Sequence, residues 1–280
     1  MRFFSLCYDI THVLYREVFI TLHMSILFSD IVFGPIKSRR FGNSLGINLL
    51  PLENKVCNFN CIYCECGWTD LKKVKVNYFD TNIIVTAIEK RFKELQKNKE
   101  SIDSITFAGN GEPTMHPDFD KIIDAVISLR NSYLPGVKIT VLSNSALLGK
   151  NKVFNALLKV DKRVLKLDAG NTNMLNLIDM PLAKRDINWY IEKLKLFNGD
   201  LNIQTIFLKG TYNEKFIDNT SNEEINTWIS ALKEIKPKEV MIYTIDRETP
   251  ASNLEKIKKD KLDEICLTLN REGIIANVYY

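Results

Sequence analysis

The chain is organised around Cys57-Asn58-Phe59-Asn60-Cys61-Ile62-Tyr63-Cys64, which directly follows the apolar segment Leu45–Leu52 and its short polar connection. The three cysteines stand at spacings of four and three residues, so their thiols belong to one short loop. Thiolates this close together form a ligand set for a soft metal centre. A four-iron cluster usually takes four cysteines, and a set of three leaves one iron open to a substrate or cofactor. The loop therefore predicts an iron–sulfur centre.

Two other interpretations of the same loop remain open at this point. Cys66 follows two residues after Cys64, so four thiols would complete a tetrahedral zinc site. Structural zinc sites mostly use two pairs of cysteines separated by a longer loop, whereas this chain has one compact group. A Cys57–Cys64 disulfide would suit a secreted protein better than this one. The zinc interpretation would make the chain a zinc-stabilised nucleic-acid-binding protein without catalysis.

Composition sets the general class of the protein. The chain has 280 residues, of which 45% are hydrophobic and 26% charged, as is usual for a globular protein of one large or two small domains. Its net charge of +4 permits a polyanionic partner such as RNA but argues only weakly for one. Six cysteines are too few for a secreted disulfide scaffold. We therefore expect a cytoplasmic protein.

The first residues need separate treatment. Met1–His23 is apolar and aromatic but is interrupted by polar residues, namely Asp9, His12, Arg16 and Glu17. It contains no uncharged segment long enough to span a bilayer and no clear signal-peptide cleavage site, so we expect no membrane partner. We treat residues 1–23 as an extension of doubtful status, either a misassigned start or a helix capping the domain. Residues 24–280 are expected to form a single domain.

Strands and helices are expected to alternate along this domain. After a short strand at Ile31–Phe33, apolar segments typical of buried strands occur at Leu45–Leu52, Ile102–Phe107, Val137–Leu142, Val164–Leu167, Leu201–Leu208, Val240–Ile245 and Ile274–Tyr279. Segments with helical periodicity lie between most of them. Six strand–helix units predict an α/β fold with a parallel sheet. The pattern leaves open whether the sheet is doubly wound or forms a full or partial (β/α) barrel.

Polar and glycine-rich residues recur where these strands end. The ends are followed by Ala108–Thr114, Ser143–Ser145, Asp168–Gly170 and Asp246–Glu248. Each group alone is explained by a turn or a helix cap. Together they point to a site, because parallel α/β folds gather their chemistry at the carboxyl ends of the strands.

Several other residues carry weaker predictions. His116 suits either acid–base chemistry or a hydrogen bond within a loop, and we favour the loop. Arg39 and Arg40 form either a solvated surface or a clamp on an anionic group. Cys266 lies on the apolar face of a helix and is expected to pack there. Cys7 is assigned no role.

The cysteine loop resembles the signature of the radical S-adenosylmethionine (radical SAM) superfamily, including the aromatic residue Tyr63. Ser38–Gly46 and Gly109–Thr114 resemble a narrower branch of Fe–S oxidoreductases related to the tRNA enzymes that build the tricyclic wyosine base. This resemblance implies a partial (β/α)6 TIM-type barrel with parallel strands.

The resemblance also implies roles for individual residues. Cys57, Cys61 and Cys64 would bind three irons of a [4Fe–4S] cluster, and the amino and carboxyl groups of SAM would chelate the fourth. Tyr63 would lie near the adenine, and Gly111-Glu112-Pro113 near the methionine amino group. The complete set of implied SAM-binding residues is Tyr63, Asn110, Gly111, Glu112, Ser143, Asn144 and Asp168. Asn110 stands where the family usually has a glycine.

The chemistry implied is that of the superfamily. A low-potential donor of the ferredoxin or flavodoxin type reduces the cluster, and SAM is cleaved to methionine and a 5′-deoxyadenosyl radical. This radical takes a hydrogen atom from a substrate, which is a tRNA base, a peptide or a small molecule. The branch resemblance and the basic residues Arg39, Arg40, Lys72, Lys73 and Lys75 support tRNA, and a peptide or small molecule remains an equal alternative. Neither Cys7 nor Cys66 nor Cys266 belongs to a second cluster motif.

Overall fold

The computed structural model describes residues 26–70 and 76–280. The expected extension at residues 1–23 and the basic residues Lys72, Lys73 and Lys75 lie outside the described residues. Within them, no helix has the length and apolar character needed to cross a membrane.

One sheet contains every strand of the described chain. The strands are β1 (Val32–Ser38), β2 (Gly42–Ile47), β3 (Ser104–Phe107), β4 (Lys138–Ser143), β5 (Lys162–Lys166), β6 (Asn202–Tyr212), β7 (Lys215–Asp218), β8 (Glu239–Thr244), β9 (Leu254–Lys256) and β10 (Ala276–Tyr279). β1 pairs antiparallel with β2, whereas every neighbouring pair from β2 to β10 along the main path is parallel.

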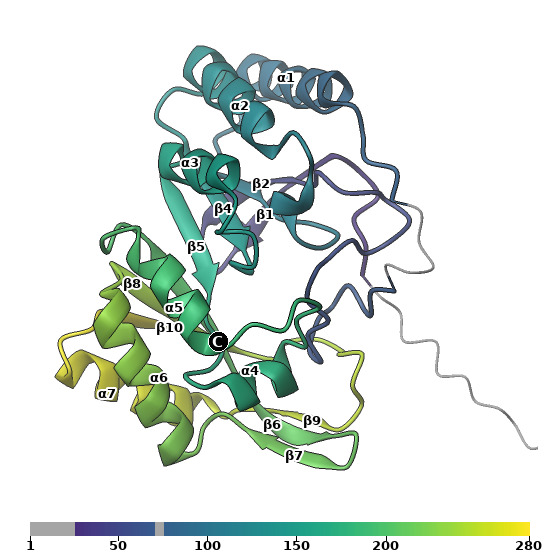
Figure 1. Cartoon of the computed structure of the whole chain (residues 1–280). Coiled ribbons are helices and arrows are strands. Elements are labelled where there is room, and N and C mark those ends of the chain that lie inside the picture. Colours follow the sequence, from purple (N-terminus) through teal and green to yellow (C-terminus); the bar gives the residue numbers. More distant parts are fainter. Residues whose placement is uncertain (1–25, 71–75) are drawn as a thin grey trace, which may run out of the picture.

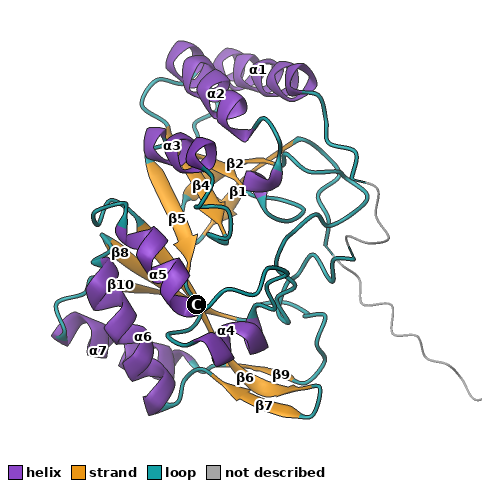
Figure 2. Ribbon diagram, in the orientation of Figure 1, coloured by secondary structure: helices purple, strands orange, loops and turns teal. Residues whose placement is uncertain are grey.

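The order of the strands decides between the two predicted architectures. Spatial order follows chain order without reversal, as β1-β2-β3-β4-β5-β6-β8-β10. A doubly wound sheet reverses its strand order at a switch point, and this sheet does not. Figure 2 shows the parallel strands curving around an interior, with the helices outside them. The prediction of a partial (β/α)6 barrel is therefore confirmed.

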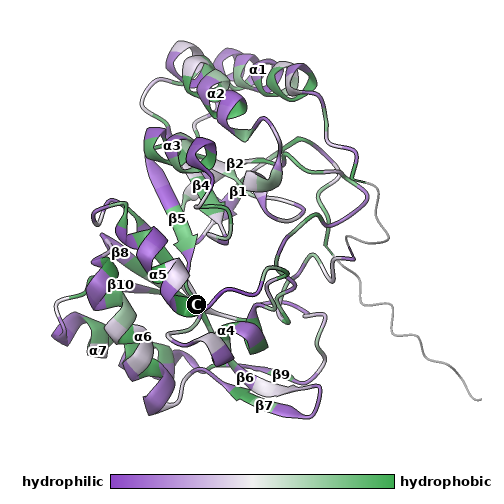
Figure 3. Cartoon of the chain, viewed as in Figure 1, coloured by the Kyte–Doolittle hydropathy of each residue, from purple (hydrophilic) through white to green (hydrophobic). Residues whose placement is uncertain are grey.

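The helices cover the outer face of the barrel. They are α1 (Thr81–Asn98), η1 (Pro113–Met115), α2 (Phe119–Tyr133), α3 (Asn151–Lys159), α4 (Thr172–Ile178), α5 (Ile187–Lys195), α6 (Asn222–Ile235) and α7 (Lys259–Arg271). α1, α2 and α3 lie beside the first strands, and α5, α6 and α7 beside the last ones (Figure 1). Each longer helix mixes hydrophobic and hydrophilic residues, as expected when one face packs on the sheet (Figure 3).

Alternation along the strands separates two environments. Leu45 and Ile105 belong to the large core shared with the helices. Their neighbours Ser44, Ser104 and Thr106 lie on the opposite face, because successive side chains of a strand alternate. There the Ser44 and Thr106 hydroxyls are 2.7 Å apart, and those of Ser104 and Thr106 are 3.1 Å apart. The barrel interior is thus partly polar.

The structure differs from the predicted strands in two places. The apolar segment Leu45–Leu52 is a strand only to Ile47, and residues 48–52 form a buried loop. Asn48 fixes this loop, since its side chain donates to Leu50 O at 3.0 Å and accepts from Leu50 N at 3.2 Å. In addition, β6 extends to Tyr212 and pairs with the short strands β7 and β9, which the sequence pattern did not predict.

Candidate functional site

The cysteine loop is held to the carboxyl end of β3 by backbone hydrogen bonds. Val56 forms a parallel bridge with Gly111. Val56 N donates to Asn110 O at 2.8 Å, and Glu112 N donates to Val56 O at 3.0 Å. A Cβ atom at Gly111 would lie 1.9 Å from Val56 O, so only glycine allows this approach.

On its other side, the loop is fixed to the last residue of α4 and to the segment that follows this helix. Ile62 N donates to Ile178 O at 2.9 Å, and Leu182 N donates to Asn58 O at 3.0 Å. Phe59 and Ile62 point into the core and are fully buried. The apolar residues between the cysteines therefore anchor the loop, and the cysteines themselves are left to face the barrel mouth.

All three predicted ligand cysteines line one hollow at this mouth. The hollow has a volume of about 150 Å³. Its lining comes from the cysteine loop, from the carboxyl ends of β3, β4 and β5, and from Gln204 within β6. It includes Cys57, Cys61, Tyr63, Cys64, Gly111, Glu112, Ser143 and Asn144. Seven predicted side chains and one predicted glycine thus meet at the strand ends, as the parallel sheet requires.

Hydrogen-bond donors surround the thiol sulfurs. Phe59 N lies 3.4 Å from Cys57 Sγ, and Asn144 Nδ2 lies 3.6 Å from the same sulfur. Lys166 Nζ lies 3.2 Å from Cys61 Sγ. Donors of this kind favour thiolates, the form in which cysteine binds metals.

The thiols differ in their tendency to ionise in the absence of metal. Burial raises the pKa of Cys57 to about 11 and raises that of Cys61 well above its ordinary value. The pKa of Cys64 is lowered, first by its hydrogen bond with Cys66 and then by the nearby Lys55 ammonium. Burial alone would lower the pKa of Lys55, but the charges of the neighbouring thiolates raise it overall. Lys55 is thus a buried cation facing the cysteines.

The positions of the metal-binding side chains bear on the zinc interpretation. Zinc–thiolate bonds of about 2.3 Å bring the sulfurs of a tetrahedral site within about 4 Å of one another. Over the described ranges, no group of three or more His, Cys, Asp or Glu side chains converges closely enough to hold a single ion. The zinc interpretation therefore finds no support in the described residues. The donor set of three half-buried or buried thiols fits a larger, multinuclear centre.

Glu112 connects the loops that follow β3 and β4. Its carboxylate accepts hydrogen bonds from Ser143 Oγ at 2.8 Å, from Asn144 N at 2.7 Å and from both N and Oγ1 of Thr114. Burial raises the pKa of Glu112, and these hydrogen bonds oppose the shift. The side chain therefore holds Ser143 and Asn144 at the hollow.

Asn110 is placed differently from the other predicted residues. It is fully buried, and its side chain turns away from the hollow toward the N-terminal segment. Asn110 Oδ1 accepts from Phe28 N at 2.8 Å, and Asn110 Nδ2 donates to Phe28 O and Pro51 O, each at 3.0 Å. The side chain thus joins three segments and does not reach the hollow.

Asp168 lies behind the hollow in a buried charged network. Its Oδ2 accepts from Tyr63 Oη and lies 3.2 Å from Lys166 Nζ, and its Oδ1 accepts from Ile206 N at 3.0 Å. Lys166 Nζ also lies 3.1 Å from Asp179 Oδ1. Burial raises the pKa of Asp179 to about 7, against the effect of Lys166. We name Tyr63, Lys166, Asp168 and Asp179 the Lys166 network.

The sequence interpretation missed three polar residues of the site, namely Lys55, Lys166 and Gln204, which line the hollow. Lys166 carried a usable signal, since it precedes Asp168 by two residues and therefore shares a strand face with it. Cys66, which entered only the zinc interpretation, also lines the hollow, with its thiol 3.6 Å from Gly109 O.

Two weaker predictions are confirmed. His116 is buried and makes loop hydrogen bonds: Nε2 lies 3.1 Å from Phe79 O, and Nδ1 accepts from Asp118 N at 3.2 Å. Cys266 packs at the edge of the core, with its thiol 3.2 Å from Ala276 O.

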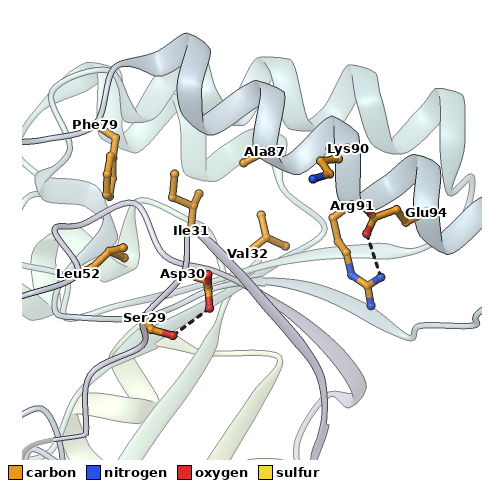
Figure 4. A pocket seen from close by; sticks show the side chains of 10 residues that line it. All are labelled: Ser29, Asp30, Ile31, Val32, Leu52, Phe79, Ala87, Lys90, Arg91 and Glu94. Atoms are coloured by element: carbon orange, nitrogen blue, oxygen red, sulfur yellow. Dashed lines mark hydrogen bonds and ion pairs between the residues drawn. The ribbon is translucent and has the colours of Figure 1, made fainter.

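Another hollow lies away from the cysteines, between residues 29–32 and α1. It measures about 370 Å³ and is lined by Ser29, Asp30 and Ile31 on one side and by Lys90 and Arg91 on the other (Figure 4). No predicted site residue reaches it.

Comparison with known proteins agrees with the fold. The family model of the radical SAM superfamily matches residues 54–217, which is more than half of the chain. The chain therefore belongs to the radical SAM superfamily, whose members typically use a [4Fe–4S] cluster and SAM.

Individual relatives give further detail. A UPF0026 protein of Helicobacter pylori is 32% identical over 256 residues, which cover 87% of this chain and 77% of that protein. A GTPase Obg of Brachyspira hyodysenteriae is 33% identical over 83% of this chain, but the chain spans only 32% of that relative. The crystal structure of a radical SAM methyltransferase from Sphaerobacter thermophilus superposes with a TM-score of 0.64 at 15% identity, over 85% of this chain and 66% of that one. This last likeness shows the shared fold.

Proposed function

We propose that the chain is a radical SAM enzyme in which Cys57, Cys61 and Cys64 hold a [4Fe–4S] cluster. The observation that carries the proposal is that these thiols line one hollow at the mouth of the barrel. A set of three thiols would leave one iron of a four-iron cluster to a ligand bound in that hollow. When bound, the cluster and SAM supply a 5′-deoxyadenosyl radical, which abstracts a hydrogen atom from the substrate.

The residues of this chain have three tasks in that reaction. The buried Phe59 and Ile62 fix the loop and exclude water from the sulfurs. Polar groups of Ser143 and Asn144 face the hollow, where SAM would bind. Glu112 orients both of them, so its role in the proposal is to position the SAM site.

The positions of the other residues predicted to bind SAM decide the role that each has in this proposal. Tyr63 and Gly111 line the hollow and can touch SAM directly. Asp168 acts through Tyr63, whose hydroxyl donates a hydrogen bond to the Asp168 carboxylate. Asn110 does not line the hollow, and its side chain is engaged with Phe28 and the loop after β2, so its role in the proposal is to hold these segments together.

Partners and location are part of the same proposal. The reaction needs a low-potential electron donor of the ferredoxin or flavodoxin type, and a tRNA base, a peptide or a small molecule as substrate. The described free cysteines, four of them within residues 57–66, suit the reducing cytoplasm.

The test uses protein purified and reconstituted without oxygen. Iron content is measured first, and 5′-deoxyadenosine is then quantified after addition of SAM and dithionite. Wild type should bind about four irons and form 5′-deoxyadenosine, whereas Cys61→Ala should form none. Iron-free protein that forms no 5′-deoxyadenosine would refute the proposal.

Two other cysteine variants sharpen the assignment. Cys266→Ala removes a thiol outside the site and should retain iron and activity. Cys66→Ala should also retain its iron, because the proposal uses three thiols. If Cys66→Ala lost iron as Cys61→Ala does, four thiols would bind the metal and no position would remain for SAM.

A further inference from the structure

A larger hollow adjoins the cysteine site. It has a volume of about 450 Å³, within the range of small-molecule sites. Its lining comes from both ends of the sheet, with Arg39 and Arg40 from the turn between β1 and β2, and Tyr243, Arg247 and Tyr279 from β8, the loop after it and β10. The hollow therefore lies where the barrel is open.

Two residues connect this hollow to the cysteine site. Leu142 lines both hollows. Gln204 lines the cysteine hollow, and its Oε1 accepts a hydrogen bond of 2.8 Å from Arg40 Nη1, which lies in the larger one. A molecule bound beside Arg40 is therefore adjacent to the proposed SAM site.

The lining of the larger hollow has an excess of positive charge, although Arg247 pairs with Glu65 at 2.7 Å outside the lining. Its lining contains four cations, Lys37, Arg39, Arg40 and Arg247, and one carboxylate, Asp246. Arg39 pairs with Asp246 at 2.9 Å, but both side chains are about half exposed. Exposed pairs of this kind contribute little to stability, so an incoming anion can replace Asp246 as the partner of Arg39.

Arg40 is the half-buried member of this group of cations that has no carboxylate partner among the described residues. Its guanidinium has five N–H donors, and its side chain makes one hydrogen bond, to Gln204. The ring of Tyr243 lies 5.1 Å from the guanidinium carbon and fixes its position. Arg40 is thus held in place with donors free.

Aromatic rings form the rest of the lining. Phe28 and Phe33 stack with centroids 3.7 Å apart, and both line the hollow, as does Tyr243. Aromatic side chains beside cations are the usual way in which proteins bind single-stranded nucleic acid, because bases stack on the rings.

We propose that this hollow binds a nucleotide unit of the substrate, with its phosphate on Arg40 and Arg39 and its base against the aromatic rings. The inference rests on the proposed function, because it names the substrate class of the same site. A phosphate monoester suits the excess of cations better than a single carboxylate, since it carries about −1.5 to −2 charges at pH 7. Free nucleotides supply this monoester, and RNA supplies successive phosphodiesters that carry one negative charge each.

The experiment measures binding by calorimetry in the presence of saturating SAM. The ligands are uridine and guanosine 5′-monophosphates, the two nucleosides, inorganic phosphate and succinate. At least one nucleotide should bind, and more tightly than its nucleoside and than succinate. Arg40→Gln should weaken that binding about tenfold or more, because a charged hydrogen bond is lost. Arg39→Gln, which changes an exposed side chain, should weaken it less.

The matched control is Arg271→Gln, which removes an exposed guanidinium at the end of α7. It should bind nucleotide as the wild type does. Thermal unfolding of each variant checks that Arg40→Gln is folded. Retention of wild-type affinity in both folded variants, Arg40→Gln and Arg39→Gln, would overturn the proposal, and so would tighter binding of succinate than of either nucleotide.

A further arm separates the two sources of phosphate. A single-stranded RNA of about ten nucleotides is titrated at two salt concentrations. If RNA is the substrate, it should bind more tightly than the mononucleotides and lose affinity with salt, with a shallower salt dependence in Arg40→Gln. If free nucleotide is the substrate, the RNA should bind no more tightly. Binding of neither RNA nor nucleotide refutes the inference.

Failure of this inference is distinguishable from failure of the proposed function. Iron content and 5′-deoxyadenosine are measured on the same preparations. Protein that forms 5′-deoxyadenosine but binds no nucleotide refutes only the substrate class. Protein that binds nucleotide through Arg40 but holds no iron refutes the proposed function.

Discussion

Lys166 Nζ lies 3.2 Å from Cys61 Sγ and 3.1 Å from Asp179 Oδ1, so one buried ammonium contacts both a predicted cluster ligand and a carboxylate. Its third partner is Asp168 Oδ2 at 3.2 Å. Burial alone would lower the pKa of Lys166, but the two carboxylates raise it well above its ordinary value. The lysine therefore stays charged, and the two buried carboxylates depend on it.

Lys166→Met should consequently destabilise the fold. It leaves two buried carboxylates without their cation, a change that typically costs about 3–5 kcal/mol in the free energy of unfolding. Denaturant unfolding of the metal-free protein measures this. The control is Lys97→Met, at an exposed position of α1, which should change the free energy by less than about 0.5 kcal/mol.

A double variant tests whether the charge is the cause. Lys166→Met with Asp179→Asn should recover part of the lost stability, because one of the uncompensated charges is gone. Additive losses in the double variant would show that Lys166 stabilises the protein through packing alone.

Gly111→Ala tests the contact between the cysteine loop and β3. The new Cβ would meet Val56 O, and the backbone has φ of +134°, so overpacking and strain together should cost about 3 kcal/mol or more. The variant should also retain less iron after reconstitution, because Val56 precedes Cys57. Iron content and thermal unfolding are the two measurements.

Gly136→Ala is the matched control for that variant. Gly136 also has positive φ, +85°, but nothing lies within 4 Å of a Cβ there. Only the backbone strain of about 1–2 kcal/mol should appear, and iron content should not change. Equal losses of iron in the two variants would contradict the role given to the Val56–Gly111 contact.

Glu112→Gln tests the link between the β3 and β4 loops. The carboxylate of Glu112 accepts four hydrogen bonds. In Glu112→Gln an amide NH2 group replaces one carboxylate oxygen, and this donor would face the N–H and O–H donors that now bind the carboxylate. We expect a loss of about 1–3 kcal/mol and weaker SAM binding in calorimetry. Glu94→Gln, on the surface of α1, is the control and should bind SAM as the wild type does. Wild-type SAM affinity in Glu112→Gln would show that Ser143 and Asn144 hold their places without the carboxylate.

The sequence pattern was sufficient to predict a parallel α/β sheet, because its strands are short, apolar and separated by helical periodicity. The choice of a partial barrel came from the resemblance of the cysteine loop to the radical SAM signature. It failed at Leu49 and Leu50, which are as apolar as strand residues because the loop that contains them is buried. It also failed at β7 and β9, whose polar residues carry no alternating pattern. Hydrophobicity reports burial, and it predicts a strand only where buried residues are also extended.

The candidate site was predicted to a different extent at different residues. Ser143 and Asn144 were found because they directly follow a strand, and the sheet brings strand ends together. Asp179 was missed, because it follows α4 and reaches the site only through the packing of that helix. Asn110 occupied a motif position, but the direction of its side chain depends on its hydrogen bond with Phe28. These two residues are 82 positions apart in the chain, so no local pattern reveals the contact.

His116 gives a prediction about pH. Burial lowers its pKa, and Nδ1 accepts from Asp118 N, so the neutral imidazole is the form that the fold stabilises. Because the folded pKa lies below the unfolded value of about 6.5, the unfolded chain binds the proton more readily. The contribution of His116 to the free energy of unfolding is therefore fully present above pH about 7 and is lost as the pH falls through the unfolded pKa.

His116→Asn keeps an acceptor for Asp118 N but cannot titrate. The free energy of unfolding of the wild type minus that of His116→Asn should decrease between pH 7 and pH 5. Subtraction cancels His12 and His23, which both proteins retain. A flat difference would mean that the imidazole is protonated as easily in the folded protein as in the unfolded chain.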